Sequence, residues 1–182
     1  AIRTTGRSGY AQNRALKLDG VREWVRIDPS PTLDLIPNDG VTISAWVNLS
    51  ERTIASATAL NIVHRHFESN GLYFLGVRNG VPRAGIKFFY ASGGRLVSDR
   101  WTHLGFTYDG IDEALYVDGQ LVATSASGLP GASIRAPISI GAKVDFFDGS
   151  IVGAMDGLID DVAIFPRGLT PAQVMFLARG CL

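Results

Sequence analysis

Short apolar stretches separated by glycine, proline and aspartate recur along the whole chain. The clearest is residues 41–47, in which the odd positions are apolar and the even positions are mostly hydroxylic. This period of two is typical of a β-strand with one buried face. Trp46 interrupts the alternation, and we expect its ring either to pack against a neighbouring segment or to present a surface to a ligand.

The same pattern predicts further strands at a spacing of roughly 8–12 residues, which is typical of all-β proteins. The other predicted strands are residues 15–18, 23–27, 60–65, 72–77, 85–90, 102–108, 114–117, 120–124, 138–140 and 158–165. Asp118 and Gly119 stand between two of them, and Asp-Gly supplies the two residues of positive φ that a type I′ hairpin turn needs. The sequence therefore predicts a tight hairpin at this point.

One helix is predicted near the end of the sequence. Thr170 can cap it, Pro171 suits its first position, and Gln173 stands three residues after the cap. We expect it to end at about residue 178. Its apolar face, which we expect to pack on the strands, holds Val174, Leu177 and Ala178. Many strands, one helix and no alternation of strands with helices predict a sandwich or barrel and exclude a parallel sheet.

Composition limits the possible functions. The 182 residues are 46% hydrophobic, which suits one domain with a real core, and we place this domain at residues 15–182 after an extension or linker at 1–14. Basic and acidic side chains number 17 each, so no net charge attracts nucleic acid or an anionic membrane. No apolar run approaches the roughly 18 residues of a membrane span. Cys181 is the only cysteine, which excludes a disulfide within the chain.

Four groups of residues occur in a fixed order along the chain: ALKLDGVREWVRI, TISAWVNL, WTHLGFTYDG with LYVDGQLV, and DGLIDDVAIFPRGLTPAQV. In this order they resemble the laminin-G-like domains of the concanavalin-A-like lectin and glucanase superfamily. The resemblance implies a two-sheet antiparallel jelly-roll β-sandwich. It also implies an extracellular or cell-surface module, often with one structural calcium ion, that binds or adheres as part of a larger multidomain chain or assembly, including beside glycoside hydrolases.

The resemblance gives calcium a candidate site, because the first and last strands of the family pair with each other. Asp19 lies in the first Leu-Asp-Gly turn, and Asp160 and Asp161 lie in the last long strand. Adjacent strand residues point to opposite faces, so both of the latter can face one ion only across a bulge. We therefore expect one of them to face solvent and favour Asp160 as the ligand. In the alternative interpretation, Asp19 forms a turn and the other two are ordinary strand-end charges.

Catalytic patterns are absent from the sequence, and we predict no enzyme. Glycoside hydrolysis needs two carboxyl groups flanking the bond, and related glucanases place acids at alternate strand positions. No such run occurs among the four glutamates, Glu23, Glu51, Glu68 and Glu113. Neither a Gly-x-Ser-x-Gly elbow in a strand-to-helix context nor a phosphate-binding loop is present. His103, alone and in a strand, is expected to be a framework residue rather than a zinc ligand.

Two loops combine aromatic and planar polar side chains, as sugar-binding sites do. The candidate ligand-binding residues are His64, Arg65, His66 and Asn70 in the first loop, and Asp145, Phe146, Phe147 and Asp148 in the second. In the alternative interpretation, the two phenylalanines close one end of the sandwich and the first loop is a solvated connection. The aromatic residues at 73–74 and 88–90 could also cover a sheet face, with one member of each set pointing into the core.

The sequence thus favours a non-catalytic recognition module for carbohydrate, with a structural calcium ion. Its partner would be a glycan or a cell-surface protein. The second hypothesis is a protein-interaction or self-assembly domain of an adhesin, filament or surface layer, and the third is an atypical glycoside hydrolase.

Overall fold

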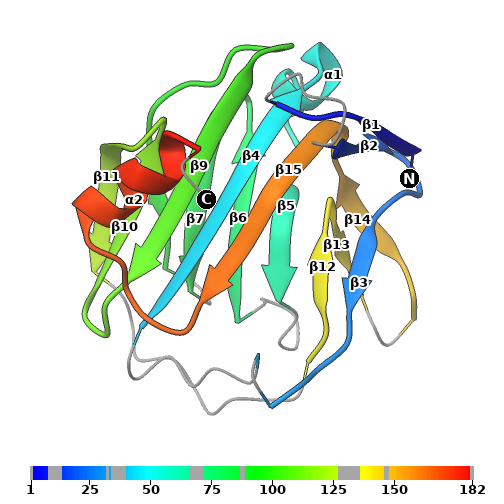
Figure 1. Cartoon of the computed structure of the whole chain (residues 1–182). Coiled ribbons are helices and arrows are strands. Elements are labelled where there is room, and N and C mark those ends of the chain that lie inside the picture. Colours follow the sequence, from blue (N-terminus) through cyan, green and yellow to red (C-terminus); the bar gives the residue numbers. More distant parts are fainter. Residues whose placement is uncertain are drawn as a thin grey trace.

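The computed structural model consists of two antiparallel β-sheets packed face to face (Figure 1). It describes residues 2–7, 14–31, 33, 40–65, 72–86, 89–126, 136–145 and 148–180. All strand pairs in these ranges are antiparallel, which confirms the predicted jelly-roll β-sandwich.

One sheet has seven strands in the order β1-β2-β15-β4-β9-β10-β11 and faces the viewer in Figure 1. Its strands are β1 (Ile2–Thr5), β2 (Arg14–Asp19), β15 (Asp156–Phe165), β4 (Val41–Leu49), β9 (Trp101–Tyr108), β10 (Asp112–Val117) and β11 (Gln120–Ala126). Helix α2 (Pro171–Ala178) lies across the outer face of this sheet, over β9 and its neighbours.

The second sheet has six strands in the order β3-β12-β5-β6-β7-β8. They are β3 (Val25–Ile27), β12 (Ile138–Ile140), β5 (Leu60–Arg65), β6 (Tyr73–Arg78), β7 (Val81–Ile86) and β8 (Ala91–Ser92). A separate hairpin of β13 (Ala142–Val144) and β14 (Ile151–Ala154) packs beside β5, and a single helical turn, α1 (Glu51–Ile54), follows β4.

The core fills the space between the two sheets. Strand β4 contributes its odd positions, as the alternation predicts, and β9 contributes Leu104, Phe106 and Tyr108 from alternate positions. A second, smaller cluster lies on the outer side of the seven-stranded sheet, where Val174 and Leu177 of α2 cover Tyr116. Two polar positions of β4 are buried on that outer side as well: Thr42 bonds to the backbone of Arg167 and Leu169, and Ser44 bonds to His103.

The local signals predicted their elements well. Asp118 and Gly119 have φ values of +48° and +78°, as a type I′ turn requires, and join β10 to β11. Thr170 and Gln173 form the predicted reciprocal cap at the start of α2. Gly180 follows the helix with a φ of +70°.

Other elements differ from the predictions. The segment expected to be an extension contributes β1, which pairs with β2 along residues 2–5. The strand predicted over residues 85–90 begins too late and runs too far: β7 spans Val81–Ile86, follows a turn at Asn79 and Gly80 of positive φ, and residues 89–90 lie in no strand. The alternation did not predict α1 or the β13–β14 hairpin. Within the described ranges, no helix has the length and apolar character needed to cross a bilayer.

Candidate functional site

A hollow of about 410 Å³ lies on the outer face of the six-stranded sheet, with one wall from the β13–β14 hairpin. Two aromatic rings, an arginine, a lysine, a histidine and an asparagine meet there. The described residues that line it are Thr58, Ala59, Leu60, Asn61, His64, Phe74, Arg83, Tyr90, Lys143 and Val152.

Strand register brings these side chains together. One row across β5, β6 and β7 consists of His64, Phe74 and Gly85. The next row on the same face consists of Asn61, Gly76 and Arg83. Since successive side chains alternate between faces, these positions share the outer face while their neighbours point inward. Tyr73 is buried in the core and Phe74 lines the hollow, as expected for that pair.

Two glycines on this face allow other parts of the backbone to approach closely. A Cβ atom at Gly76 would collide with the carbonyl oxygen of Leu60, and one at Gly85 would collide with the carbonyl oxygen of Phe89 and lie 2.7 Å from Cβ of Tyr90. Gly85 thus lets the chain fold back over the sheet after β7. The backbone N–H of Phe89 donates to the carbonyl oxygen of Ile86 over 3.1 Å in this turn.

Arg83 and the two rings form a stacked cluster. The guanidinium carbon lies 4.2 Å from the ring centre of Tyr90 and 5.4 Å from that of Phe74, within the range of cation–π attraction. The two ring centres are 6.4 Å apart. Tyr90 remains 47% exposed, so part of its ring can contact a ligand.

The structure separates His64 from Arg65, which the sequence analysis placed in one ligand-binding loop. His64 faces the hollow but is only 2% exposed, so it forms part of the floor. Arg65 points to the opposite side, is fully buried, and donates from Nη1 to the carbonyl oxygen of Leu33. The prediction that Arg65 contacts a ligand is therefore wrong, because strand alternation turns it into the protein.

The second predicted loop lies at the turn between β13 and β14. The backbone N–H of Asp145 donates to the carbonyl oxygen of Ser150 over 2.9 Å, and a carboxylate oxygen of Asp148 accepts from the N–H of Ser150 over 2.8 Å. Both hydrogen bonds shape the turn. The one from the N–H of Ser150 favours the charged carboxylate and lowers the pKa of Asp148. Neither aspartate lines the hollow. The other predicted residues, His66, Asn70, Phe146 and Phe147, lie outside the described residues.

Asp19 acts as a turn former. Its Oδ1 atom accepts hydrogen bonds of 2.8, 2.9 and 3.0 Å from the backbone N–H groups of Val21, Arg22 and Glu23. These donors favour the charged carboxylate and lower its pKa to about 2. In the sheet, Asp19 lies opposite Asp156 rather than Asp160.

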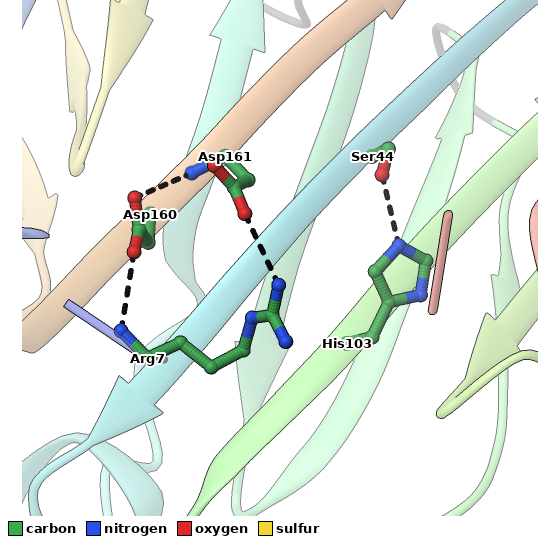
Figure 2. Close-up of polar contacts among 5 residues, drawn as sticks. All are labelled: Arg7, Ser44, His103, Asp160 and Asp161. Atoms are coloured by element: carbon green, nitrogen blue, oxygen red, sulfur yellow. Dashed lines mark hydrogen bonds and ion pairs between the residues drawn. The ribbon is translucent and has the colours of Figure 1, made fainter. Parts of the chain in front are cut away.

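Asp160 and Asp161 both face Arg7, as Figure 2 shows. A register shift interrupts the pairing of β15 with β4 after Asp160, and Asp161 has a φ of +46°, so a bulge turns both carboxylates to one side. The Asp160 carboxylate accepts from the backbone N–H of Arg7 over 3.3 Å, and Asp161 accepts from its guanidinium over 3.4 Å. Asp161 is the more exposed of the two, as expected for one of them, but its carboxylate also pairs with Arg7.

Arg7 continues this cluster toward β4 and β9. Its guanidinium carbon lies 4.2 Å from the ring centre of Trp46, and that ring contacts His103 edge-on at 5.4 Å between centres. Nε2 of His103 is 2.8 Å from Oγ of Ser44 (Figure 2). Burial, together with the charge of Arg7, lowers the pKa of His103 to about 4 although Asp118 opposes the shift. Trp46 and His103 thus belong to the framework.

The three carboxylates expected at calcium do not fit one ion. The register places Asp160 four residues along β15 from the partner of Asp19, about 13 Å at the rise of a strand. Calcium ligands lie at about 2.3–2.6 Å from the ion, so Asp19 and Asp160 cannot share one. No group of three or more acidic, histidine or cysteine side chains in the described ranges is arranged to hold a metal. Calcium binding stays a prediction from the resemblance.

Comparison with protein families identifies the fold. The profile described as the concanavalin A-like lectin/glucanases superfamily, of laminin-G type, matches residues 19–175. The chain belongs to this superfamily. No protein of curated function matches the chain by sequence.

Solved structures of the same jelly-roll fold include a heptameric SAP-like pentraxin from Limulus polyphemus, at 16% identity and a TM-score of 0.69, covering 92% of this chain and 82% of that one. Domain 4 of AbnA, an extracellular arabinanase from Geobacillus stearothermophilus, is 21% identical with a TM-score of 0.69. The match covers 97% of this chain and 80% of the AbnA domain. The ligand-binding domain of botulinum neurotoxin serotype D matches at 16% and 0.71, covering 98% of this chain and 44% of that one, so this chain spans under half of it.

Three residues of the hollow in this superfamily member were not among the predicted site residues: Asn61, Arg83 and Lys143. A signal existed for Arg83, because Asn79-Gly80 is as strong a hairpin sequence as Asp118-Gly119 and fixes which residues of β7 face outward. No comparable pattern in the sequence indicated that the Tyr90 ring lies against Arg83.

Proposed function

We propose that the chain is a non-catalytic carbohydrate-recognition module and that the hollow on the six-stranded sheet binds the sugar. The observation that carries this proposal is the half-exposed ring of Tyr90 beside the polar groups of Asn61 and Arg83. An aromatic face stacks on the apolar side of a sugar ring, while planar polar groups fix the hydroxyls.

Two structural neighbours support the proposal. The AbnA domain was solved in complex with arabinotriose, and the botulinum neurotoxin domain in complex with N-acetylneuraminic acid. The arabinanase is described as extracellular, which favours an extracellular or cell-surface location for this module as well. The described lining of the hollow contains no carboxylate, whereas glycoside hydrolysis uses a pair of them, and this favours binding over cleavage.

A second hollow gives room for more than one sugar unit. It has a volume of about 650 Å³ and shares Thr58 and Leu60 with the first. Arg52 and Asp156 line it, but no aromatic side chain does so among the described residues. We therefore place the main contact at Tyr90 and assign the second hollow to further units of an oligosaccharide.

A glycan array tests the proposal. Wild type should bind a defined set of glycans, and Tyr90→Ala should weaken binding about tenfold or more through loss of ring contact. Phe176→Ala is the matched control, because Phe176 of α2 is similarly exposed, at 52%, but lies outside both hollows. Equal binding by wild type and Tyr90→Ala would contradict the assignment of the site.

Protein interaction is the alternative function. An apolar hollow of about 380 Å³ between α2 and the end of β15 is lined by Phe165, Leu169 and Phe176. An empty glycan array, together with concentration-dependent oligomers that Phe176→Ala abolishes, would favour this alternative. Turnover of a polysaccharide by the isolated chain would instead indicate the atypical hydrolase.

A further inference from the structure

The hollow combines its aromatic rings with positive charge. Of the described residues that line it, Arg83 and Lys143 are cationic and none is an aspartate or a glutamate. The chain as a whole has equal numbers of acidic and basic side chains, so this is a local feature rather than a consequence of net charge. A local positive field favours a ligand of negative charge.

Arg83 is held in one orientation by its surroundings. Its guanidinium stacks on Tyr90 and lies near Phe74, and its cross-strand neighbour is Gly76, which has no side chain. The N–H donors of a guanidinium lie in its plane, so stacking on its face leaves them free to bind at its edge.

These donors have no partner among the described residues. Neither a hydrogen bond nor an ion pair joins the Arg83 guanidinium to another residue in the described part of the chain. Its Nε atom is buried, so the two Nη groups provide the donors that reach the hollow. A partly buried cation without a counter-charge favours an anion that supplies one, and a planar fork matches carboxylate or sulfate oxygens well.

We propose that the sugar recognised at the hollow carries an acidic group, a carboxylate or a sulfate, and that the Nη groups of Arg83 bind it. This inference rests on the proposed function and deepens it: Tyr90 supplies stacking that any sugar can use, and Arg83 selects the acidic one. Lys143 pairs with Val152 in the β13–β14 hairpin, which forms one wall of the hollow, and adds a second positive charge there.

The test compares two acidic sugars with their neutral counterparts, and one sulfated sugar with an unsulfated counterpart that still carries carboxylates. The probes are trigalacturonate against galactotriose, sialyllactose against lactose, and chondroitin sulfate against unsulfated chondroitin, first on an array and then by titration calorimetry. The last pair separates sulfate from carboxylate recognition. The variants are Arg83→Met, which keeps an apolar stem against the rings, and Arg78→Met as a matched control. Arg78 lies on the neighbouring strand, donates to the carbonyl oxygen of Ala57, and does not line the hollow.

We expect wild type to bind at least one acidic or sulfated member about tenfold or more tightly than its neutral or unsulfated counterpart, as a hydrogen bond between charged groups allows. Arg83→Met should bring that ratio close to one while neutral binding and the melting temperature are retained, and Arg78→Met should keep the ratio. Equal binding of neutral and acidic partners by wild type, or an acidic preference that survives in Arg83→Met, would overturn the inference and leave the proposed function standing. Binding of no glycan at all would overturn both.

Discussion

Replacing His103 should remove a loss of stability that the wild-type protein suffers in mild acid. His103 is fully buried, and burial lowers its pKa from 6.5 to about 4. Above pH 6.5 the imidazole is neutral in both folded and unfolded chains. Between 6.5 and about 4 only the unfolded chain binds the proton, so the free energy of unfolding falls as the pH falls through this window.

The size of the effect follows from the two pKa values. The full difference corresponds to about 3 kcal/mol, and the part lost between about pH 7 and pH 5 is about 2 kcal/mol. Asp19, Asp109 and Asp148 have lowered pKa values, so they also contribute acid sensitivity. Their contribution acts as these carboxylates protonate, and it is common to wild type and variant.

Urea unfolding of wild type and His103→Gln at these two pH values measures the effect. Glutamine retains a polar group for Oγ of Ser44 and does not titrate in this range. Any packing defect it causes lowers stability at both pH values and cancels in the difference. Wild type should lose about 2 kcal/mol more than the variant on acidification. Equal losses in the two proteins would refute the assignment of a depressed pKa to His103.

Two further substitutions test how the site and the fold are held. Gly85→Ala should displace the segment that carries Tyr90, and the glycan-array signal should fall as in Tyr90→Ala. The control, Ser92→Ala on the same sheet, should bind normally. Normal binding by Gly85→Ala would refute the role of that glycine. Thr53→Val removes a hydroxyl that donates to the carbonyl oxygen of Asp156 and accepts from its N–H, both over 2.8 Å, and should cost about 1–3 kcal/mol in urea unfolding. Thr53→Ser keeps the hydroxyl and should retain most of the wild-type stability, and a Thr53→Val variant as stable as wild type would refute the role of the hydroxyl.

The sequence predicts those parts of the fold whose signal is local. Alternation at residues 41–47 correctly identifies the buried face of β4, and Asp118-Gly119 correctly identifies a hairpin, because each depends on the chain's own geometry. The β13–β14 hairpin escaped prediction because its strands are three and four residues long and their pairing shifts register after Ala142. The three-residue strand β12 was predicted, so the interrupted alternation after Ala142, more than the shortness of these strands, hid the hairpin.

The site was less predictable than the fold, because it is assembled from residues whose proximity depends on backbone approach. The sequence shows Arg83 and Tyr90 seven residues apart, but only the missing side chain at Gly85 lets the chain return over the sheet and stack the two. The predicted loops were chosen by composition, which cannot show that Arg65 points into the protein while its neighbour His64 faces the hollow.

The carboxylates of β15 show the same dependence on backbone geometry. Strand alternation would place Asp160 and Asp161 on opposite faces, and the expectation that only one of them faces the ion implied by the resemblance followed from that rule. The positive φ of Asp161 instead turns both carboxylates toward Arg7. Because Arg7 belongs to the segment that follows β1, the carboxylates expected to hold calcium anchor the N-terminal residues to the last strand. The positive charge that pairs with Asp161 is therefore the guanidinium of Arg7.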